Sequence, residues 1–542
     1  MLPTCHVNRL LRTTRQIASR VPALRAISSD SSTAAIHDDV NSAWGEEFLR
    51  VTEGVSCHMS HAESAAAMRT LLRTGALRNT DLRDNPDRFF KAHRILARHA
   101  VAHGPGFWIR FTVHYNLCMG TVLAVGSEEQ IAQLDSFQSA GELGCFALTE
   151  KLAGVQSGLL VQTTAIFDRA TDQFILNSPS EGAQKNWISQ GFTADKAVVL
   201  ADLTVGGECR GPHAFLVNLR KEGELVRDVS VGDMGVKTTG NDLDNAWIKF
   251  DQMRVPRSSL LSGYVSVSKD GEYERCGENI KPFEMIGQRL YTGRVVVAQA
   301  ALAYCRQLFK VTKGYTDNKA VWTPFAVEGE LPSLSDIPQL RALYQAAPEH
   351  QASEAEERIG KMDTFVQLCE TRLSPLLPKR EVPSPDLANA IAVAKVKAVE
   401  TSIDLCWRLK QEVGSYALMG SSGFVHLDFL NCCKFAEGDS RILMQKMSRD
   451  RFRRALKEKK AGINPREAEV CEWPKMRCFH RTPRRSITKR SQVQEVELCM
   501  QLATALSVAK GDKRLEAQIW EEQWANVYAL AEAVMSRTIK EF

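Results

Sequence analysis

The chain has 542 residues, of which 44% are apolar, 25% charged and 7% aromatic. This composition excludes a disordered or fibrous protein and predicts several packed globular domains. The 69 basic and 64 acidic residues leave a net charge of +5, too small over this length to predict binding to nucleic acid or a membrane surface. No stretch approaches the roughly 18 to 20 consecutive apolar residues of a membrane-spanning helix.

The cysteines and histidines do not form a motif for metal binding or hydrolysis. Fourteen cysteines are scattered without a CxxC pair, which predicts reduced thiols and neither a disulfide scaffold nor a zinc site. The twelve histidines include no HExxH, and no G-x-S-x-G accompanies them. The sequence therefore predicts no metal and no serine hydrolase.

The amino terminus is typical of a targeting leader, predicted over residues 1–38. Its first 29 residues carry five arginines and no acidic residue, with apolar residues at helical spacing. This pattern predicts the mitochondrial matrix, with cleavage between about Ile27 and Thr33. The spacing of Arg9-Leu10 and Gln16-Ile17 is similar to a peroxisomal nonapeptide signal, so the peroxisome remains the alternative. The carboxyl terminus, Lys540-Glu541-Phe542, is not of the S-K-L type.

Hydrophobic periodicity divides the rest of the chain into four predicted parts. These parts are a helical domain (39–143), an antiparallel β domain (144–270), a second helical domain (271–455), and a basic segment with a helical tail (456–542). The strands are expected at 159–167, 173–176, 197–203, 213–219 and 246–250, between turn residues. The fold class is therefore α+β, with a sheet between two helical domains.

Several motifs, read in chain order, carry a resemblance to a known family. Thr149-Glu150 near a strand start, Trp187-Ile188-Ser189, and Arg254-Val255-Pro256 after the β domain are similar to segments of the acyl-CoA dehydrogenase and acyl-CoA oxidase superfamily. The segments 111–117, 174–179 and 211–215 resemble the oxidases most. The resemblance covers roughly residues 107–447 and implies the fold of that superfamily, with an additional tail.

The resemblance also implies a catalytic base and a flavin site. Phe435-Ala436-Glu437-Gly438-Asp439 is similar to the oxidase segment that holds the base, which implies that Glu437 abstracts the α-proton of a thioester. This reaction needs a carboxylate held away from water with a raised pKa. The other implied contacts are Thr149, Trp187, Ser189 and Gly191 for FAD, and Arg294 for the acyl-CoA.

Three further positions correspond to contacts that the family makes with FAD: two across a subunit interface, at Lys319 and Trp322, and one near the adenine half of the flavin, at Gly420. Lys319 and Trp322 stand where the family has arginine and phenylalanine, and Gly420 lies in a segment that has lost one of the family's glycines. Lysine keeps the charge of arginine but not its bidentate geometry. These substitutions keep open the alternative of a catalytically weak structural or assembly protein on the same fold.

The sequence thus predicts an FAD-dependent acyl-CoA oxidase that acts in fatty-acid β-oxidation and introduces a trans α,β double bond. The first alternative is a mitochondrial acyl-CoA dehydrogenase, and the second is the assembly protein. The expected partners are an acyl-CoA and either molecular oxygen or an electron-transfer flavoprotein, within a homodimer or homotetramer.

Overall fold

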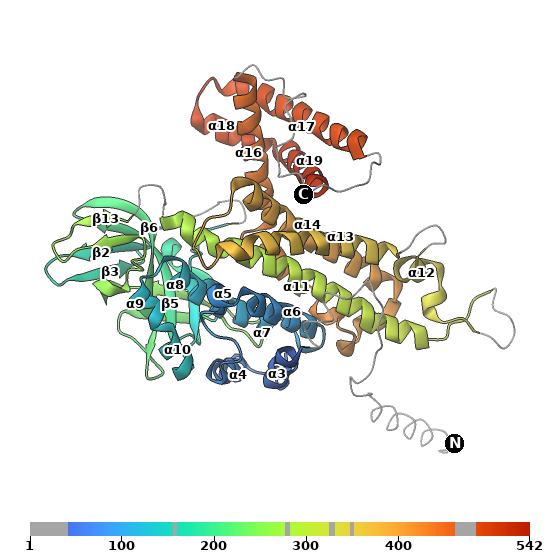
Figure 1. The fold of residues 1–542 in the computed structure, drawn as a ribbon, viewed down its shortest axis with the longest axis horizontal. Coiled ribbons are helices and arrows are strands. Elements are labelled where there is room, and N and C mark those ends of the chain that lie inside the picture. The colour runs from blue at the N-terminus through green and yellow to red at the C-terminus, as the bar shows by residue number, and fades with distance from the viewer. Residues whose placement is uncertain (1–41, 155–159, 277–281, 325–330, 347–351, 461–483) are drawn as a thin grey trace, which may run out of the picture.

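The computed structural model describes residues 42–154, 160–276, 282–324, 331–346, 352–460 and 484–542. The predicted leader and most of the predicted basic segment fall outside these ranges. Figure 1 shows helices, then strands, then long helices, and finally a separate group of helices near the carboxyl terminus. This order confirms the α+β fold class. No helix in the described ranges is long and apolar enough to cross a membrane.

The amino-terminal part consists of helices whose ends are set by local sequence. Helix α4 (His61–Thr74), for example, begins with a capping box, because Ser60 and Glu63 each bind the other's backbone amide. The other helices here are α3 (Ala43–Thr52), α5 (Asp81–Asp84), α6 (Pro86–His103), α7 (Gly106–Thr112), the π-helical segment η1 (Val113–Met119), α8 (Gly120–Val125), α9 (Glu128–Ala132) and α10 (Leu134–Ala140).

The larger sheet is built around the long strand β5 (Lys196–Val205). One edge of β5 pairs antiparallel with β6 (Glu208–Asn218). Along its other edge, β5 pairs parallel first with β1 (Gly144–Ala147) and then with β2 (Thr164–Asp168). These two parallel pairs depart from the predicted all-antiparallel pairing, because the chain between β2 and β5 is long enough to form the crossover that parallel strands need.

Antiparallel strands complete the middle part of the chain. Strands β3 (Gln173–Asn177) and β11 (Met253–Pro256) extend the larger sheet beyond β2. A second sheet has the order β4-β10-β9, formed by β4 (Lys185–Ser189), β10 (Asn245–Phe250) and β9 (Val229–Asp233). Residues of both sheets belong to one buried cluster. Two hairpins, β7 (Arg220–Lys221) with β8 (Glu224–Leu225) and β12 (Val265–Val267) with β13 (Tyr273–Arg275), lie outside these sheets.

Three long helices form the carboxyl-terminal bundle: α11 (Pro282–Asn318), α13 (Glu354–Leu373) and α14 (Pro385–Glu412), which run side by side in Figure 1. Helix α11 is the longest of the three, with 37 residues. The remaining helices are α12 (Pro338–Tyr344), α15 (Asp428–Phe435), α16 (Ser440–Lys460), α17 (Arg484–Leu506), α18 (Lys513–Glu522) and α19 (Trp524–Glu541).

The tail helices are joined by one buried carboxylate. Glu495 on α17 is 2.8 Å from Arg451 on α16 and 2.7 Å from Arg537 on α19. Because Glu495 is almost fully buried and bound on both oxygens, it fixes α16, α17 and α19 relative to one another.

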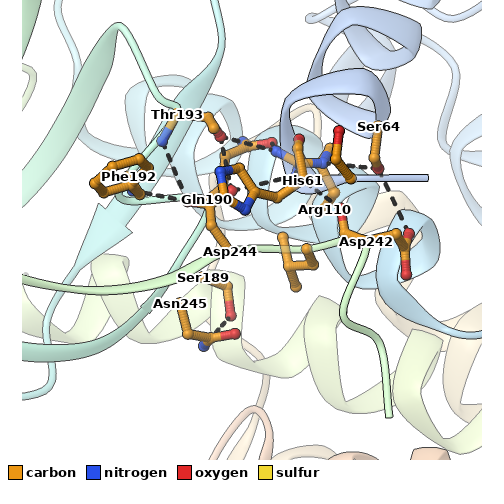
Figure 2. A network of polar contacts seen from close by, with 12 residues as sticks. His61, Ser64, Arg110, Ser189, Gln190, Phe192, Thr193, Asp242, Asp244 and Asn245 are labelled. Carbon is orange, nitrogen blue, oxygen red and sulfur yellow. Dashed lines mark hydrogen bonds and ion pairs between the residues drawn. The ribbon is translucent and has the colours of Figure 1, made fainter. Parts of the chain in front are cut away.

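A buried ion pair joins the amino-terminal helices to the second sheet (Figure 2). The Arg110 guanidinium on α7 lies 3.2 Å from a carboxylate oxygen of Asp244, and both side chains have no solvent exposure. The guanidinium also donates to the Ser64, Gln190 and Thr193 side chains and to the carbonyl oxygens of His61 and Asp242. The second Asp244 oxygen accepts hydrogen bonds from the amides of Phe192 and Thr193. The network therefore fixes the end of β4 and the start of β10.

Replacing Arg110 with methionine should destabilise the protein strongly, because Asp244 would remain buried with its charge unpaired. We expect a loss of about 3 to 5 kcal/mol in the free energy of unfolding, measured by urea unfolding of the purified protein. The control is Arg169→Met, which removes the exposed pair with Asp270 and should cost about 0 to 1 kcal/mol. Equal losses in the two variants would contradict a central role for the buried pair.

Candidate active site

Glu437 lies in the short connection between α15 and α16, and its backbone has an unusual conformation. Its φ is 58°, and the φ of Gly438 is 94°. Two consecutive residues in the left-handed region turn the chain sharply, and the second value favours glycine strongly. This turn directs the Glu437 side chain back toward α11 and leaves Asp439 to cap α16 through the amide of Arg441.

The Glu437 carboxylate packs directly against the backbone of α11. A Cβ atom on Gly293 would lie 2.1 Å from the Glu437 Cδ atom and within 2.5 Å of both carboxylate oxygens. Any residue larger than glycine at position 293 would therefore displace the carboxylate. Glu437 is only 9% exposed as a result of this packing.

Two cations, the half-buried Arg294 and the buried Lys395, hold the main chain around Glu437 without binding its carboxylate. The Arg294 Nε donates to the Glu437 carbonyl oxygen at 3.0 Å. The Lys395 ammonium, on α14, donates to the carbonyl oxygens of Lys434 and Gly438 and to the Ser440 hydroxyl, at 2.6, 3.0 and 3.1 Å. Burial lowers the pKa of Lys395 to about 7. The three acceptor oxygens oppose this effect, because they match the three protons of the charged ammonium.

The carboxylate itself has one partner among the described residues. Its Oε1 atom accepts a hydrogen bond from the Asn116 Nδ2 at 3.3 Å, and its Oε2 atom has none from the described part of the chain. Burial raises the pKa of Glu437 to about 8, although Arg294, the Asn116 hydrogen bond and Lys395 each lower it. The structure therefore contains a desolvated carboxyl group whose pKa suits a general base near neutral pH.

The residues predicted to contact the flavin ring lie together at the edge formed by β1 and β4. Thr149 follows β1, and its carbonyl oxygen accepts the amide of Asn186 on β4. Trp187 has a φ of 57° and a side chain that is 58% exposed, an uncommon backbone conformation for a bulky residue. Half-buried Ser189 accepts a hydrogen bond from the Asn245 side chain at 3.2 Å, as Figure 2 shows.

Gly191 also packs closely within its own chain at this edge. A Cβ atom on Gly191 would lie 3.0 Å from the Ala246 Cβ and 3.0 Å from the Ile188 carbonyl oxygen. The close approach that requires a small residue is therefore to strand β10 of the same chain. A contact of Gly191 with FAD stays a prediction.

A second buried ion pair supports this edge. Lys185 at the start of β4 lies 2.9 Å from Glu150, and neither side chain is exposed. Glu150 also accepts the amides of Gln162 and Thr163, at 2.7 and 2.8 Å. The pair joins the residue after Thr149 to the strand that carries Trp187 and Ser189, so it fixes these side chains relative to one another.

The π-helical segment η1 connects this edge to Glu437. The backbone amide of Gly144, at the start of β1, donates to the His114 Nδ1 at 3.1 Å. The proton of the neutral ring therefore lies on Nε2, which is 3.0 Å from the Asn79 Oδ1. Asn116, two residues along η1, donates to Glu437. One segment thus contacts both the first strand of the predicted flavin edge and the predicted base.

Lys319, Trp322 and Gly420 lie far from this region of the same chain. Arg294 and Asn318, the last residue of α11, are separated by about 36 Å at the helical rise per residue, and Lys319 follows directly. Stacking of the Tyr315 and Tyr416 rings, with centroids 3.7 Å apart, brings the end of α11 close to the segment that precedes Gly420. All three residues are exposed to solvent, and Trp322 is 76% exposed. The structure therefore separates the predicted site residues into two regions.

Three residues that hold Glu437 were not predicted from the sequence: Asn116, Gly293 and Lys395. Lys395 is fully buried within an apolar stretch of α14, and a lysine within such a stretch was the available signal. Asn116 and Gly293 carried no local signal, because their contact with Glu437 joins residues hundreds of positions apart. The structure shows Arg294 donating a hydrogen bond to the Glu437 carbonyl oxygen. Its predicted contact with the acyl-CoA stays a prediction.

The raised pKa of Glu437 predicts a pH-dependent effect on stability. The unfolded chain ionises this group near 4.5, whereas the folded protein does so only near 8, so Glu437 increasingly opposes folding as the pH rises between these values. Glu437→Gln should therefore stabilise the protein at pH 8 by up to about 5 kcal/mol, with no gain near pH 4.5. Thermal unfolding across this range measures the difference.

The control for this measurement is Glu497→Gln, which changes an exposed carboxylate on α17. Its stability relative to the unmodified protein should not vary with pH in this way. A Glu437→Gln gain that is the same at pH 5 and pH 8 would contradict the raised pKa.

Comparisons with known proteins identify relatives of the chain. Acyl-coenzyme A oxidase 2 of Yarrowia lipolytica is 32% identical over 362 residues, which are 62% of this chain and 49% of that protein. Peroxisomal acyl-coenzyme A oxidase 3 of Homo sapiens is 30% identical over 356 residues, with the same shares covered. The chain thus spans about half the length of these curated relatives. No protein-family model matches it.

Solved structures share the fold over almost the whole chain. Acyl-CoA oxidase 1 of Yarrowia lipolytica has a TM-score of 0.71 at 19% identity, covering 94% of this chain and 78% of that one. Acyl-CoA oxidase-2 of Caenorhabditis elegans, solved with FAD, ascaroside-CoA and ATP, has a TM-score of 0.71 at 16% identity, covering 100% of this chain and 83% of that one.

The predicted mitochondrial address is wrong. The human relative is peroxisomal by name, as is acyl-coenzyme A oxidase 2 of Arabidopsis thaliana, which is 26% identical over 393 residues covering 70% of this chain and 54% of that protein. An arginine-rich leader without acidic residues is shared by more than one kind of targeting signal, so the composition of residues 1–38 did not distinguish them. These relatives point to the peroxisome.

The relatives and the solved structures agree with each other and with the motifs in the sequence. The chain is therefore homologous to the acyl-CoA oxidases and has their fold.

Proposed function

We propose that this protein is an FAD-dependent acyl-CoA oxidase that introduces a trans α,β double bond into an acyl-CoA, in fatty-acid β-oxidation in the peroxisome. The observation that carries the proposal is the buried Glu437 carboxyl group, whose Oε2 atom is unpartnered among the described residues. A structural carboxylate in this position would be expected to be hydrogen-bonded on both oxygens. A base that accepts a proton needs one oxygen available.

Glu437 takes the α-proton of the acyl thioester in this proposal. Its ionised form is the reactive one, and its exclusion from water raises its affinity for the proton. A pKa of about 8 lies close enough to the working pH that the group can ionise and still accept a proton effectively. Arg294 and Lys395 hold the connecting loop, so the carboxylate keeps its position as its charge changes.

The residues at the β1 and β4 edge fit a flavin ring. Thr149 is exposed and Ser189 half-buried, so their hydroxyls can hydrogen-bond the ring edge, and Trp187 offers an exposed aromatic face. When bound, FAD supplies the acceptor for the hydride that leaves the β-carbon. The strained backbone of Trp187 also supports a binding role, because such conformations cluster at ligand sites.

Molecular oxygen is the proposed electron acceptor, since the curated relatives are oxidases. The test is acyl-CoA-dependent formation of hydrogen peroxide by the purified protein. Reduction of an added electron-transfer flavoprotein or dye without peroxide formation would favour a dehydrogenase instead.

We propose a homodimer in which the end of α11 reaches the partner's cofactor. Lys319 directly follows the end of α11, which lies about 36 Å along the helix from Arg294, so the two residues serve different parts of the assembly. Large apolar side chains near this end are exposed, with Trp322 at 76%, Leu418 at 80% and Met419 at 57%. Such a concentration of exposed apolar surface favours a protein partner.

Glu437→Gln should abolish most of the α-proton abstraction, because glutamine keeps the volume but accepts no proton. Anaerobic bleaching of the flavin by a saturated acyl-CoA should slow by at least ~10²- to 10⁴-fold. Ligand-induced spectral shifts should show that binding persists. Asp439→Asn is the matched control, since asparagine also caps a helix, and it should bleach at nearly the normal rate. Bleaching of Glu437→Gln at the unmodified rate would exclude Glu437 as the base.

Lys319→Ala should weaken retention of FAD, because a lysine near the phosphates contributes attraction that alanine lacks. The loss should be greatest at low ionic strength and shrink as salt screens the charge. Flavin absorbance after gel filtration measures occupancy and, with the elution volume, the oligomeric state. Lys313→Ala removes a nearby lysine paired with Asp317 and should have no effect. Identical FAD retention in both variants would remove Lys319 from the site.

A further inference from the structure

The two oxygens of the Glu437 carboxylate are not equivalent, and Asn116 makes the difference. Oε1 accepts the Asn116 amide at 3.3 Å, whereas Oε2 has no partner among the described residues. Close packing against Gly293 restricts movement of both oxygens. The carboxylate is therefore held with one oxygen bound and the other available.

Asn116 reaches Glu437 because its helix is locally widened. It lies in the π-helical segment η1, between the regular helices α7 and α8. Such segments occur as single turns and are frequent at functional sites. Asn116 is fully buried, and a buried amide side chain is costly unless its donors and acceptor are bound.

The neighbouring groups fix which end of the Asn116 amide faces Glu437. The Thr292 hydroxyl lies 2.6 Å from Asn116 Oδ1 and 2.9 Å from the Arg289 carbonyl oxygen, and its one proton has the shorter contact with Oδ1. The Asn116 Nδ2 donates to the Arg289 carbonyl oxygen at 3.2 Å. Since a carbonyl oxygen only accepts, the nitrogen must lie on the side of Arg289 and Glu437. One proton of Nδ2 is then donated to the Arg289 carbonyl oxygen and the other to Glu437 Oε1. Thr292 holds Oδ1 on the opposite side.

We infer that Asn116 is a positioning residue for Glu437: it holds Oε1, keeps the carboxylate ionisable in its buried site, and leaves Oε2 to take the substrate's proton. Thr292 acts one step further out, by preventing the amide from turning its oxygen toward the carboxylate. The catalytic part of this role rests on the proposed function. The effect of Asn116 on the ionisation of Glu437 can be measured without turnover.

The measurement is an infrared titration of the protonated Glu437 carboxyl group in the purified holoprotein. Each spectrum is compared with that of the same protein carrying Glu437→Gln, so the difference reports this group alone. Asn116→Leu has a similar shape but cannot donate. It should raise the titration midpoint by about one to two pH units, the shift that corresponds to losing a hydrogen bond to a charged group.

Two substitutions at Thr292 provide a milder variant and its control. Thr292→Val removes the hydroxyl and should raise the midpoint in the same direction, because the amide is no longer held. Thr292→Ser keeps the hydroxyl and should leave the midpoint unchanged. If Asn116→Leu does not fold, the pair of Thr292 variants decides the question. Unchanged midpoints in Asn116→Leu and Thr292→Val overturn the inference.

The pH profile of anaerobic flavin bleaching separates this inference from the proposed function. In the variants, the acid limb of the profile should move upward with the infrared midpoint, and bleaching should recover at higher pH. A merely structural role would lower the rate equally at every pH, and that result overturns the catalytic part of the inference. Shifted midpoints in a protein that never bleaches would refute the proposed function but keep the coupling of Asn116 to Glu437.

Discussion

The structure around Glu437 depends on one constraint: a carboxylate must be kept out of water without being neutralised by a direct ion pair. Two cations, Arg294 and Lys395, lie nearby, and both donate to oxygens other than those of the carboxylate. A direct ion pair would lower the pKa of Glu437 far below neutrality. By holding the loop instead, Arg294 and Lys395 stabilise the left-handed turn and leave the carboxyl group with a pKa of about 8. The cations therefore fix position while burial sets the affinity for the proton.

This arrangement requires contributions from elements that are distant in sequence. Helix α11 supplies a glycine that leaves room for the carboxylate, α14 supplies Lys395, and η1 supplies Asn116. The same η1 segment binds the start of β1 through His114. Because the Arg110 network joins the helix before η1 to the ends of β4 and β10 (Figure 2), the predicted flavin edge and the predicted base are held by one continuous set of buried polar contacts.

The length of α11 favours a second subunit, because its two ends cannot serve one site. A helix that runs without interruption from Pro282 to Asn318 necessarily carries its two ends far apart. Arg294 serves the loop of Glu437, whereas Lys319 lies at the opposite end beside exposed apolar side chains. The lysine and tryptophan that replace arginine and phenylalanine keep charge and aromatic character there, which fits a contact with FAD from the partner.

The sequence by itself determined the fold class and the likeness to the acyl-CoA oxidases, because periodicity and short motifs are local properties of the chain. It also singled out Glu437, whose role as the base stays a prediction. It did not determine the address of the leader, the parallel pairing of β5 with β1 and β2, or the structural reason for Gly191. The residues that tune Glu437 also escaped it. Asn116, Gly293 and Lys395 meet Glu437 only after helices far apart in sequence have packed, and desolvation, which raises its pKa, exists only in the folded protein. Tertiary structure therefore decided the burial, the hydrogen bonding and the raised pKa of the predicted base.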